Sequence, residues 1–258
     1  MLRARKERQT AGWRLEPRLG IRERIGEKRG MMLRRGVLAL AAPLLGAAGG
    51  TAEEAARASL SPAQVMLFET PHLASAEPPL RLDYEFRREE AGKEPVVDAI
   101  RLVVRAAAGQ RGGRDVSPEF LTGPRALSYP PALGFSGNPL LLFALDRDTR
   151  ELSAATGGSA MWFRNRFRHA LATAAELRPA EVEHGGRRLP ATTISLVPYA
   201  GEPRARRYQE RRYAFTLAEA LPGWVHAIRT ELPPAEGQAA VMESIVFAGT
   251  FPLPGGAG

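Results

Sequence analysis

GFSGNPLLLFALDRDTRELSAATGGSAMWFRNRFRHALATA, residues 134–174, is the one long stretch of this chain with helical periodicity and with clear start and stop signals. Asn138 is a favourable N-cap, and Pro139 suits the first helical position, where its missing N–H costs nothing. Gly157 and Gly158 supply a stop, so these signals predict a first helix between Pro139 and Gly157. The face expected to be buried carries Leu141, Leu145, Thr149 and Leu152.

The second half of the stretch predicts another helix, which begins after Ser159. Apolar residues recur at helical spacing, and the Ala-rich continuation also favours a helix. The expected buried face carries Ala160, Phe163, Phe167, Ala170, Leu171 and Ala174. The same letters alternate from 163 to 168, where every second residue is arginine, so a strand is the competing interpretation of residues 160–174.

Strand-like segments stand on both sides of this helical pair. Alternation of apolar and polar residues is clearest over 80–88 and recurs along the chain. The further segments are 96–104, 116–121, 182–184, 187–198, 213–217, 224–232 and 241–251. The pattern predicts an α+β fold: a single large curved antiparallel sheet of seven or eight strands, with a two-helix insertion packed on one face. This layout resembles the half-barrels of bacterial lipoprotein carriers and related periplasmic binding proteins.

Composition divides the chain into five parts. Residues 1–30 are arginine-rich and lack apolar periodicity, and we interpret them as a non-native upstream extension; a disordered cytoplasmic extension is the alternative. Residues 31–52 are an export signal, and 53–79 form an N-terminal segment with a short helix. A single α+β domain over 80–251 and a flexible tail over 252–258 complete the prediction.

The export signal is MMLRRGVLALAAPLLGAAGGTA, residues 31–52. Arg34 and Arg35 precede an apolar run, and Gly50-Thr51-Ala52 offers a small-x-small cleavage site. The paired arginines resemble a twin-arginine signal, and this route and ordinary secretion both stay open. The apolar run is short for a bilayer-spanning helix, with an N-terminal membrane anchor as the alternative. We therefore predict a periplasmic protein whose mature chain has no transmembrane span.

The charge distribution argues against a nucleic-acid partner. The formal net charge is +8, but the whole excess lies in the first 35 residues, and acidic and basic residues balance from residue 53 onward. The body of the chain therefore has no global field that would steer it onto DNA or RNA. The chain has no cysteine, which excludes disulfides, thiolate metal sites and a thiol nucleophile.

Candidate ligand-binding residues gather in the two predicted helices. Asp148 lies at the margin of the apolar stripe, and a carboxylate buried there must be paired, with an arginine of the second helix as the expected partner. Those arginines could instead receive a carboxylate or a phosphate, and an exposed tryptophan beside them suits an amphipathic ligand. The predicted ligand-binding set is Asp148, Trp162, Arg164, Arg166, Arg168 and His169.

The run RARRYQERR, residues 204–212, is the other concentration of charge in the body of the chain. We favour a solvated strand edge, because charged edges protect a sheet from pairing with other chains. The alternative is a surface that rests on an anionic partner such as lipid or cell-wall polymer.

These features favour a non-enzymatic exported protein that binds or carries an apolar or amphipathic ligand between the sheet and the helices. One alternative is an envelope protein–protein interaction module without a pocket, whose partner is another envelope protein. A hydrolase that uses Asp148 and His169 is a further alternative. The four histidines do not stand at metal-ligand spacing, so we expect no metal and no cofactor.

Overall fold

A computed structural model of the chain describes residues 60–109 and 112–254. The predicted upstream extension and export signal lie outside the described residues, as do 53–59 and 255–258. Among the residues described, no helix is both long enough and apolar enough to cross a membrane.

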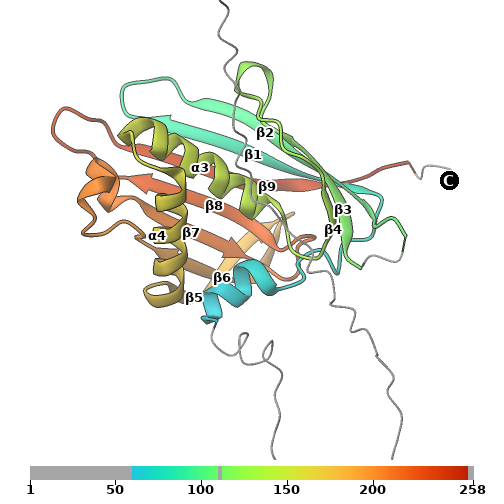
Figure 1. The fold of residues 1–258 in the computed structure, drawn as a ribbon. Helices are drawn as coiled ribbons and strands as arrows, with labels where there is room; N and C mark the ends of the chain where they lie inside the picture. The colour runs from blue at the N-terminus through green and yellow to red at the C-terminus, as the bar shows by residue number, and fades with distance from the viewer. Residues whose placement is uncertain (1–59, 110–111, 255–258) are drawn as a thin grey trace, which may run out of the picture. The chain divides into compact units, whose positions relative to one another are not determined.

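The described residues form one antiparallel sheet of nine strands that does not close on itself, with the order β4-β3-β2-β1-β9-β8-β7-β6-β5 (Figure 1). The fold class is therefore the predicted α+β, with nine strands in place of seven or eight. The strands are β1 (Leu80–Glu90), β2 (Val96–Ala106), β3 (Arg114–Phe120), β4 (Ala132–Phe135), β5 (Glu176–His184), β6 (Arg187–Leu196), β7 (Arg212–Leu217), β8 (Val225–Leu232) and β9 (Val241–Pro252).

The alternation in β1 shows how the sequence sets the sheet. Leu80, Leu82, Tyr84 and Phe86 are buried, while the residues between them are partly or fully exposed. A strand places successive side chains on opposite faces, so one face of β1 turns to the core. β1 pairs with β2 on one side and β9 on the other, which makes it central to the sheet.

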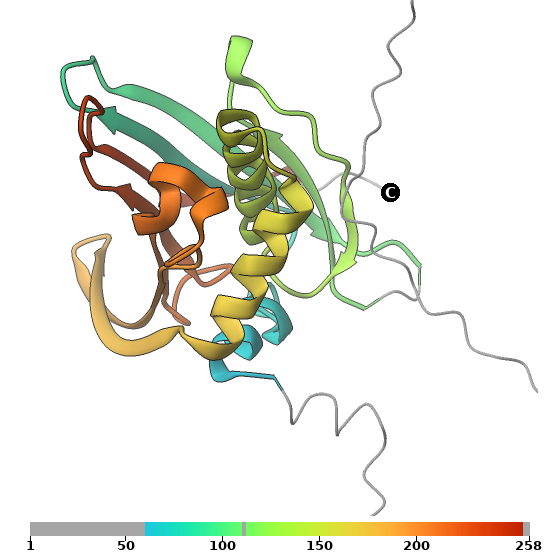
Figure 2. The ribbon, with the colours of Figure 1, turned by 60° about the vertical axis from the view of Figure 1, so that its left-hand side comes forward.

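Two helices connect β4 to β5 and lie on the concave face of the sheet (Figures 1 and 2). They are α3 (Leu140–Thr156) and α4 (Ala160–Thr173), so the two-helix insertion is confirmed and residues 160–173 are a helix and not a strand. The predicted face of α3 is buried throughout, from Leu141 to Leu152.

Asn138 anchors the start of α3. Its side-chain oxygen accepts a hydrogen bond from the backbone N–H of Leu140 at 3.1 Å, as expected of a capping side chain, although the N-cap position itself is Pro139, one residue later than predicted. Its side-chain amide also donates to the Tyr84 hydroxyl at 3.0 Å and to the Gly223 carbonyl at 2.9 Å. One buried side chain therefore joins the helix to β1 and to the turn before β8.

Several short helical segments complete the fold. Ser61 and Gln64 form a capping box at the start of α2 (Pro62–Gln64), which continues into η1 (Val65–Glu69). η2 (Gly123–Arg125) lies between β3 and β4, and η3 (Pro203–Glu210) leads into β7.

The predicted strand edge at 204–212 is wrong. Residues 203–210 form η3, and β7 lies inside the sheet between β6 and β8. The chain does not continue as a strand there, because residues 203–210 form helical turns in which Ala205 is buried, and Arg211 directly after them is buried as well.

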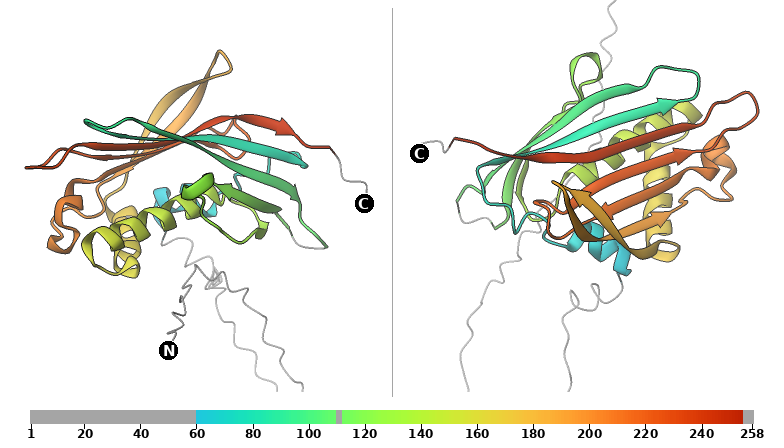
Figure 3. Two further views of the ribbon diagram at one scale, coloured as in Figure 1. Left: turned by 90° about the horizontal axis from the view of Figure 1, so that it is seen from above. Right: turned by 180° about the vertical axis from the view of Figure 1, so that it is seen from behind.

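The hairpin of β5 and β6 rises from the sheet on the face opposite the helices (Figure 3). Near its tip, the ring centroid of His184 lies 5.0 Å from that of Phe247. β5 is one edge of the sheet, and it begins six residues earlier than the segment predicted at 182.

Candidate functional site

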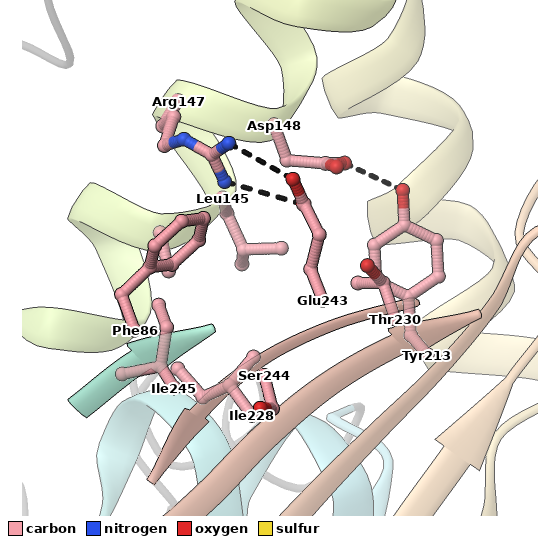
Figure 4. A pocket seen from close by; sticks show the side chains of 11 residues that line it. Phe86, Leu145, Arg147, Asp148, Tyr213, Ile228, Thr230, Glu243, Ser244 and Ile245 are labelled. Carbon is pink, nitrogen blue, oxygen red and sulfur yellow. Dashed lines mark hydrogen bonds and ion pairs between the residues drawn. The ribbon is translucent and has the colours of Figure 1, made fainter. Parts of the chain in front are cut away.

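Charged residues of α3 are also buried against the sheet, beside its apolar face. Asp148 is only 5% exposed, and one of its carboxylate oxygens accepts a hydrogen bond from the guanidinium of Arg211 at 2.5 Å. The other oxygen accepts a hydrogen bond from the Tyr213 hydroxyl, also at 2.5 Å (Figure 4). A buried carboxylate is stable only when paired and hydrogen-bonded, and both conditions hold here.

The carboxylate of Glu243 in β9 forms ion pairs with three arginines. Arg88 of β1 approaches it at 2.7 Å, Arg147 of α3 at 3.0 Å, and Arg211 at 3.3 Å. Burial alone would favour the neutral acid, but Arg147, Arg211 and Arg88 outweigh burial and lower the pKa of Glu243 to about 2. Glu243 is therefore ionised at any ordinary pH and ties α3 to the middle of the sheet.

Arg147 links this cluster to the surface. Its guanidinium donates to Glu243 and to Glu151, and lies 4.8 Å from the centroid of the Phe86 ring (Figure 4). Partial burial raises the pKa of Glu151, Arg147 opposes this effect, and the negative charges of Glu243 and Asp148 add to it. Glu151 therefore holds its negative charge less firmly than Glu243 does.

Arg211 and Tyr213 are fixed in their protonated states. Burial would lower the pKa of Arg211, but Asp148 and then Tyr213 and Glu243 raise it above its ordinary value. Burial and the charge of Asp148 raise the pKa of Tyr213 well above its ordinary value. Arg211 also donates to the hydroxyl of Thr230 at 3.0 Å. Neither group can exchange a proton with a substrate near neutral pH.

Beneath α3, this network closes a small pocket (Figure 4). Its volume is about 30 Å³, the room of one water molecule. Its apolar wall consists of Phe86, Ala144, Leu145, Ile228 and Ile245. The space between α3 and the sheet is thus filled by side chains and cannot hold a lipid chain in this conformation.

A larger groove lies on the other side of Asp148, at the end of α3 and beside η3. Its volume is about 570 Å³, within the usual range for small-molecule sites. The apolar part of its lining is Leu152, Ala154, Ala155, Tyr208, Leu232 and Val241. The charged part is Arg88, Glu90, Asp148, Glu151, Arg207 and Arg211.

The acids of the groove all have cationic partners. Asp148 pairs with Arg211, Glu151 with Arg147 at 2.7 Å, and Glu90 with Lys93 at 2.7 Å. These pairs leave one groove cation, Arg207, without a carboxylate at ion-pair distance within the described part of the chain. Lys93, and more weakly Arg88 and Arg207, lower the pKa of Glu90.

Arg207 is held by its neighbours but keeps an unsatisfied donor. Its Nη2 donates to the backbone carbonyl of Ala239 at 2.9 Å. Its Nε is buried and has no hydrogen-bond partner among the described residues, and the same holds for Nε of Arg211. Buried donors of this kind are rare, because each costs about 1–3 kcal/mol if nothing accepts from it. The groove therefore combines apolar walls with one guanidinium, that of Arg207, which has no carboxylate within ion-pair distance among the described residues.

The predicted site residues do not converge on one cavity. Asp148 reaches the groove, but its partner is Arg211 and not an arginine of α4, so the expected pairing was wrong. Arg164 is buried and binds Asp146 at 2.5 Å instead. Arg166 forms an ion pair with Glu202.

The other three predicted residues lie elsewhere on α4. Trp162 is half-buried and stacks on Tyr199 with ring centroids 6.4 Å apart. Arg168 and His169 are exposed. Asp148 and His169 are not brought together, since Asp148 is buried against the sheet and His169 points to solvent.

Sequence reasoning missed Arg207, Arg211 and Glu243 as site residues. A signal existed for Glu243, because it alternates with Val241 and Ile245 on the face of β9 that turns inward. The run at 204–212 drew attention for its charge, but a single sequence does not tell which arginine turns inward.

Known proteins add little to these observations. Comparison with known protein families gives no match, and comparison with curated protein sequences gives none either. Among solved structures, the chain is similar to the LolA superfamily protein NE2245 from Nitrosomonas europaea, with 6% sequence identity and a TM-score of 0.21. The alignment covers 74% of this chain and 94% of that one. No group of three or more metal-ligating side chains comes together within residues 60–109 and 112–254. The site is therefore argued from its own geometry.

Proposed function

We propose that the protein is a non-enzymatic binding or carrier protein for an amphipathic ligand, and that the ligand lies in the groove beside η3. The observation that carries the proposal is the guanidinium of Arg207, which lines the groove and has no carboxylate within ion-pair distance among the described residues. A phosphate or carboxylate head on the ligand would satisfy it, since the guanidinium fork suits both groups.

The apolar part of the groove supports the second half of the proposal. Ala154 and Ala155 are exposed and Tyr208 is partly exposed in the lining of the groove, and they offer a surface on which a hydrocarbon chain gains free energy by leaving water. A ligand with an anionic head and one short chain matches both sets of groups. The volume of about 570 Å³ suits one such chain and not a lipid with several long chains.

The two other functions proposed from the sequence receive less support. A hydrolase with Asp148 and His169 would need both side chains at one cleft. Asp148 is instead engaged by Arg211 and Tyr213. An interaction module without a pocket leaves the groove, and the guanidinium of Arg207 in its lining, without a role.

Export to the periplasm belongs to the same proposal. It rests on the sequence of residues 31–52 alone, which have the charge, apolar run and cleavage pattern of an export signal. A binding protein for amphiphiles would protect an apolar chain from water in that compartment.

Three amphiphiles with the same chain test the proposal: dodecyl phosphate, dodecanol and dodecyltrimethylammonium, each titrated below its micellar concentration and followed by calorimetry. We expect the phosphate to bind most tightly and the cation not to bind. Arg207→Gln should weaken phosphate binding about tenfold or more, because a hydrogen bond to a charged group contributes about 1.5–3 kcal/mol. Arg105→Gln removes an exposed arginine outside the groove and should change nothing. Equal affinity for the cation, or equal losses in both variants, would contradict the proposal.

A further inference from the structure

The outward side of η3 carries cations that the groove does not use. Residues 203–212 contain five arginines and one glutamate, and Arg204, Arg206 and Arg212 are exposed. Arg204 and Arg206 make no ion pair within the described part of the chain. Arg212 has a loose one, 3.8 Å from Glu231, with both side chains more than half exposed. These three arginines, called the η3 patch below, form a basic surface on a body whose charges balance overall.

Within this patch, the backbone of Arg206 has an unusual conformation. Its φ of 52° and ψ of −129° fall in a region that side-chain-bearing residues rarely adopt. Such a conformation is energetically unfavourable and persists only where the surroundings impose it. Here the side-chain amide of Gln209 donates to the Arg206 carbonyl at 3.1 Å. Strain of this kind collects at functional positions more often than on passive surface.

Exposed apolar side chains adjoin the η3 patch. The stack of Trp162 on Tyr199 and the ion pair of Arg166 with Glu202 tie the first turns of α4 to the segment just before η3. On α4, Met161 is 55% exposed and Trp162 is partly exposed. In the segment before η3, Val197 is 38% exposed. Arginine beside methionine and a partly exposed indole is the composition of surfaces that lie at the headgroup level of a bilayer.

We propose that the η3 patch, with Met161 and Trp162, docks the protein on an anionic lipid surface. Anionic phospholipid headgroups pair with Arg204 and Arg206, which have no acidic partner within the described part of the chain. The apolar side chains enter the headgroup layer. A nucleic acid would use the cations and leave Met161 and Val197 in water. This inference goes beyond the proposed ligand and does not depend on it, although η3 also lines the groove through Arg207 and Tyr208.

The test uses the full chain and vesicles of phosphatidylcholine with and without phosphatidylglycerol, read out by co-sedimentation. Each basic side chain at an anionic membrane contributes about a fivefold factor in affinity, so Arg204→Gln with Arg206→Gln should weaken binding on the order of 25-fold. The matched control is Arg187→Gln with Arg188→Gln, which removes two exposed arginines from the start of β6, in the hairpin on the other face of the sheet. The control should bind like the wild type, and salt should weaken binding in both.

A site-specific label separates this surface from the basic N-terminal residues. The chain has no cysteine, so Glu210→Cys and Arg187→Cys each place a single nitroxide, the first at the end of η3 and the second on the control hairpin. Only the label at 210 should become accessible to oxygen dissolved in the lipid. Vesicle binding without lipid contact at 210, equal losses in the two double variants, or no binding to anionic vesicles would overturn the inference. The last result would instead indicate an acidic protein as the partner of the patch. If the protein docks on vesicles but binds no dodecyl phosphate, the proposed function is contradicted and this inference is not.

Discussion

Glu243→Gln tests whether the buried cluster beneath α3 is held by one carboxylate. The substitution keeps the shape of the side chain and removes the charge that Arg88, Arg147 and Arg211 share. In the folded protein the pKa of Glu243 falls from 4.5 to about 2. Each pKa unit corresponds to about 1.4 kcal/mol, so ionised Glu243 contributes roughly 3 kcal/mol to the free energy of unfolding. Removal of one partner from a buried ion pair typically costs about 3–5 kcal/mol, which agrees.

The stability difference between wild type and Glu243→Gln should also depend on pH. A carboxyl whose pKa is lowered by folding contributes stability above its unfolded pKa, and loses that contribution as the pH falls through the folded pKa. The difference between wild type and Glu243→Gln should therefore be full at pH 7 and should vanish between about pH 5 and pH 2.

Thermal unfolding measured by circular dichroism from pH 7 to pH 2 checks both statements. For a domain of this size, a loss of about 3 kcal/mol lowers Tm by roughly 6–12 °C. Glu236→Gln, an exposed glutamate between β8 and β9, is the matched control and should leave Tm unchanged. A Tm loss below about 2 °C, or a loss that persists unchanged at low pH, would refute the reasoning.

Three further substitutions probe the anchor of α3 and the charge of the groove. Asn138→Ala should destabilise the protein by roughly 2–4 kcal/mol in urea unfolding, because it removes a helix cap and leaves a buried hydroxyl and carbonyl without their donor. Gly223→Ala should cost more than Gly201→Ala in the same assay: both have positive φ, but a Cβ at 223 would lie 2.9 Å from the Asn138 side-chain nitrogen, and at 201 it meets nothing within 4 Å. Equal costs would argue against close packing at 223. Glu151→Gln should tighten dodecyl phosphate binding in calorimetry, because it removes a negative charge from the groove. The raised pKa of Glu151 indicates that the groove disfavours this charge. Weaker binding by this variant would count against an anionic ligand.

Much of the fold could be predicted because local signals and burial agree. Asn138, Pro139 and Gly157 mark the ends of α3, and the structure gives the glycine the left-handed conformation of a C-cap. The alternation in β1 and β9 matches their buried faces. β4 was missed because it has four residues, too few for alternation to stand out.

The candidate site was harder to predict because its members come from distant parts of the chain. Asp148 was recognised as a carboxylate in need of a partner, but the choice among arginines depends on how α3 lies across the sheet. That packing turns Asp148 toward Arg211, which is 63 residues away, and gives Arg164 to Asp146. Periodicity shows which residues share a face, and only the tertiary structure shows what that face meets.

Native mass spectrometry of the protein, purified without detergent from the cells that produce it, tests the central claim most directly. Wild type and Arg207→Gln are compared, with Arg105→Gln as the control. We predict that wild type and control carry an extra mass that is released on denaturation and identifies as an anionic amphiphile, and that Arg207→Gln carries less of it. A bare polypeptide mass in all three proteins, together with no binding of added dodecyl phosphate, would contradict the account.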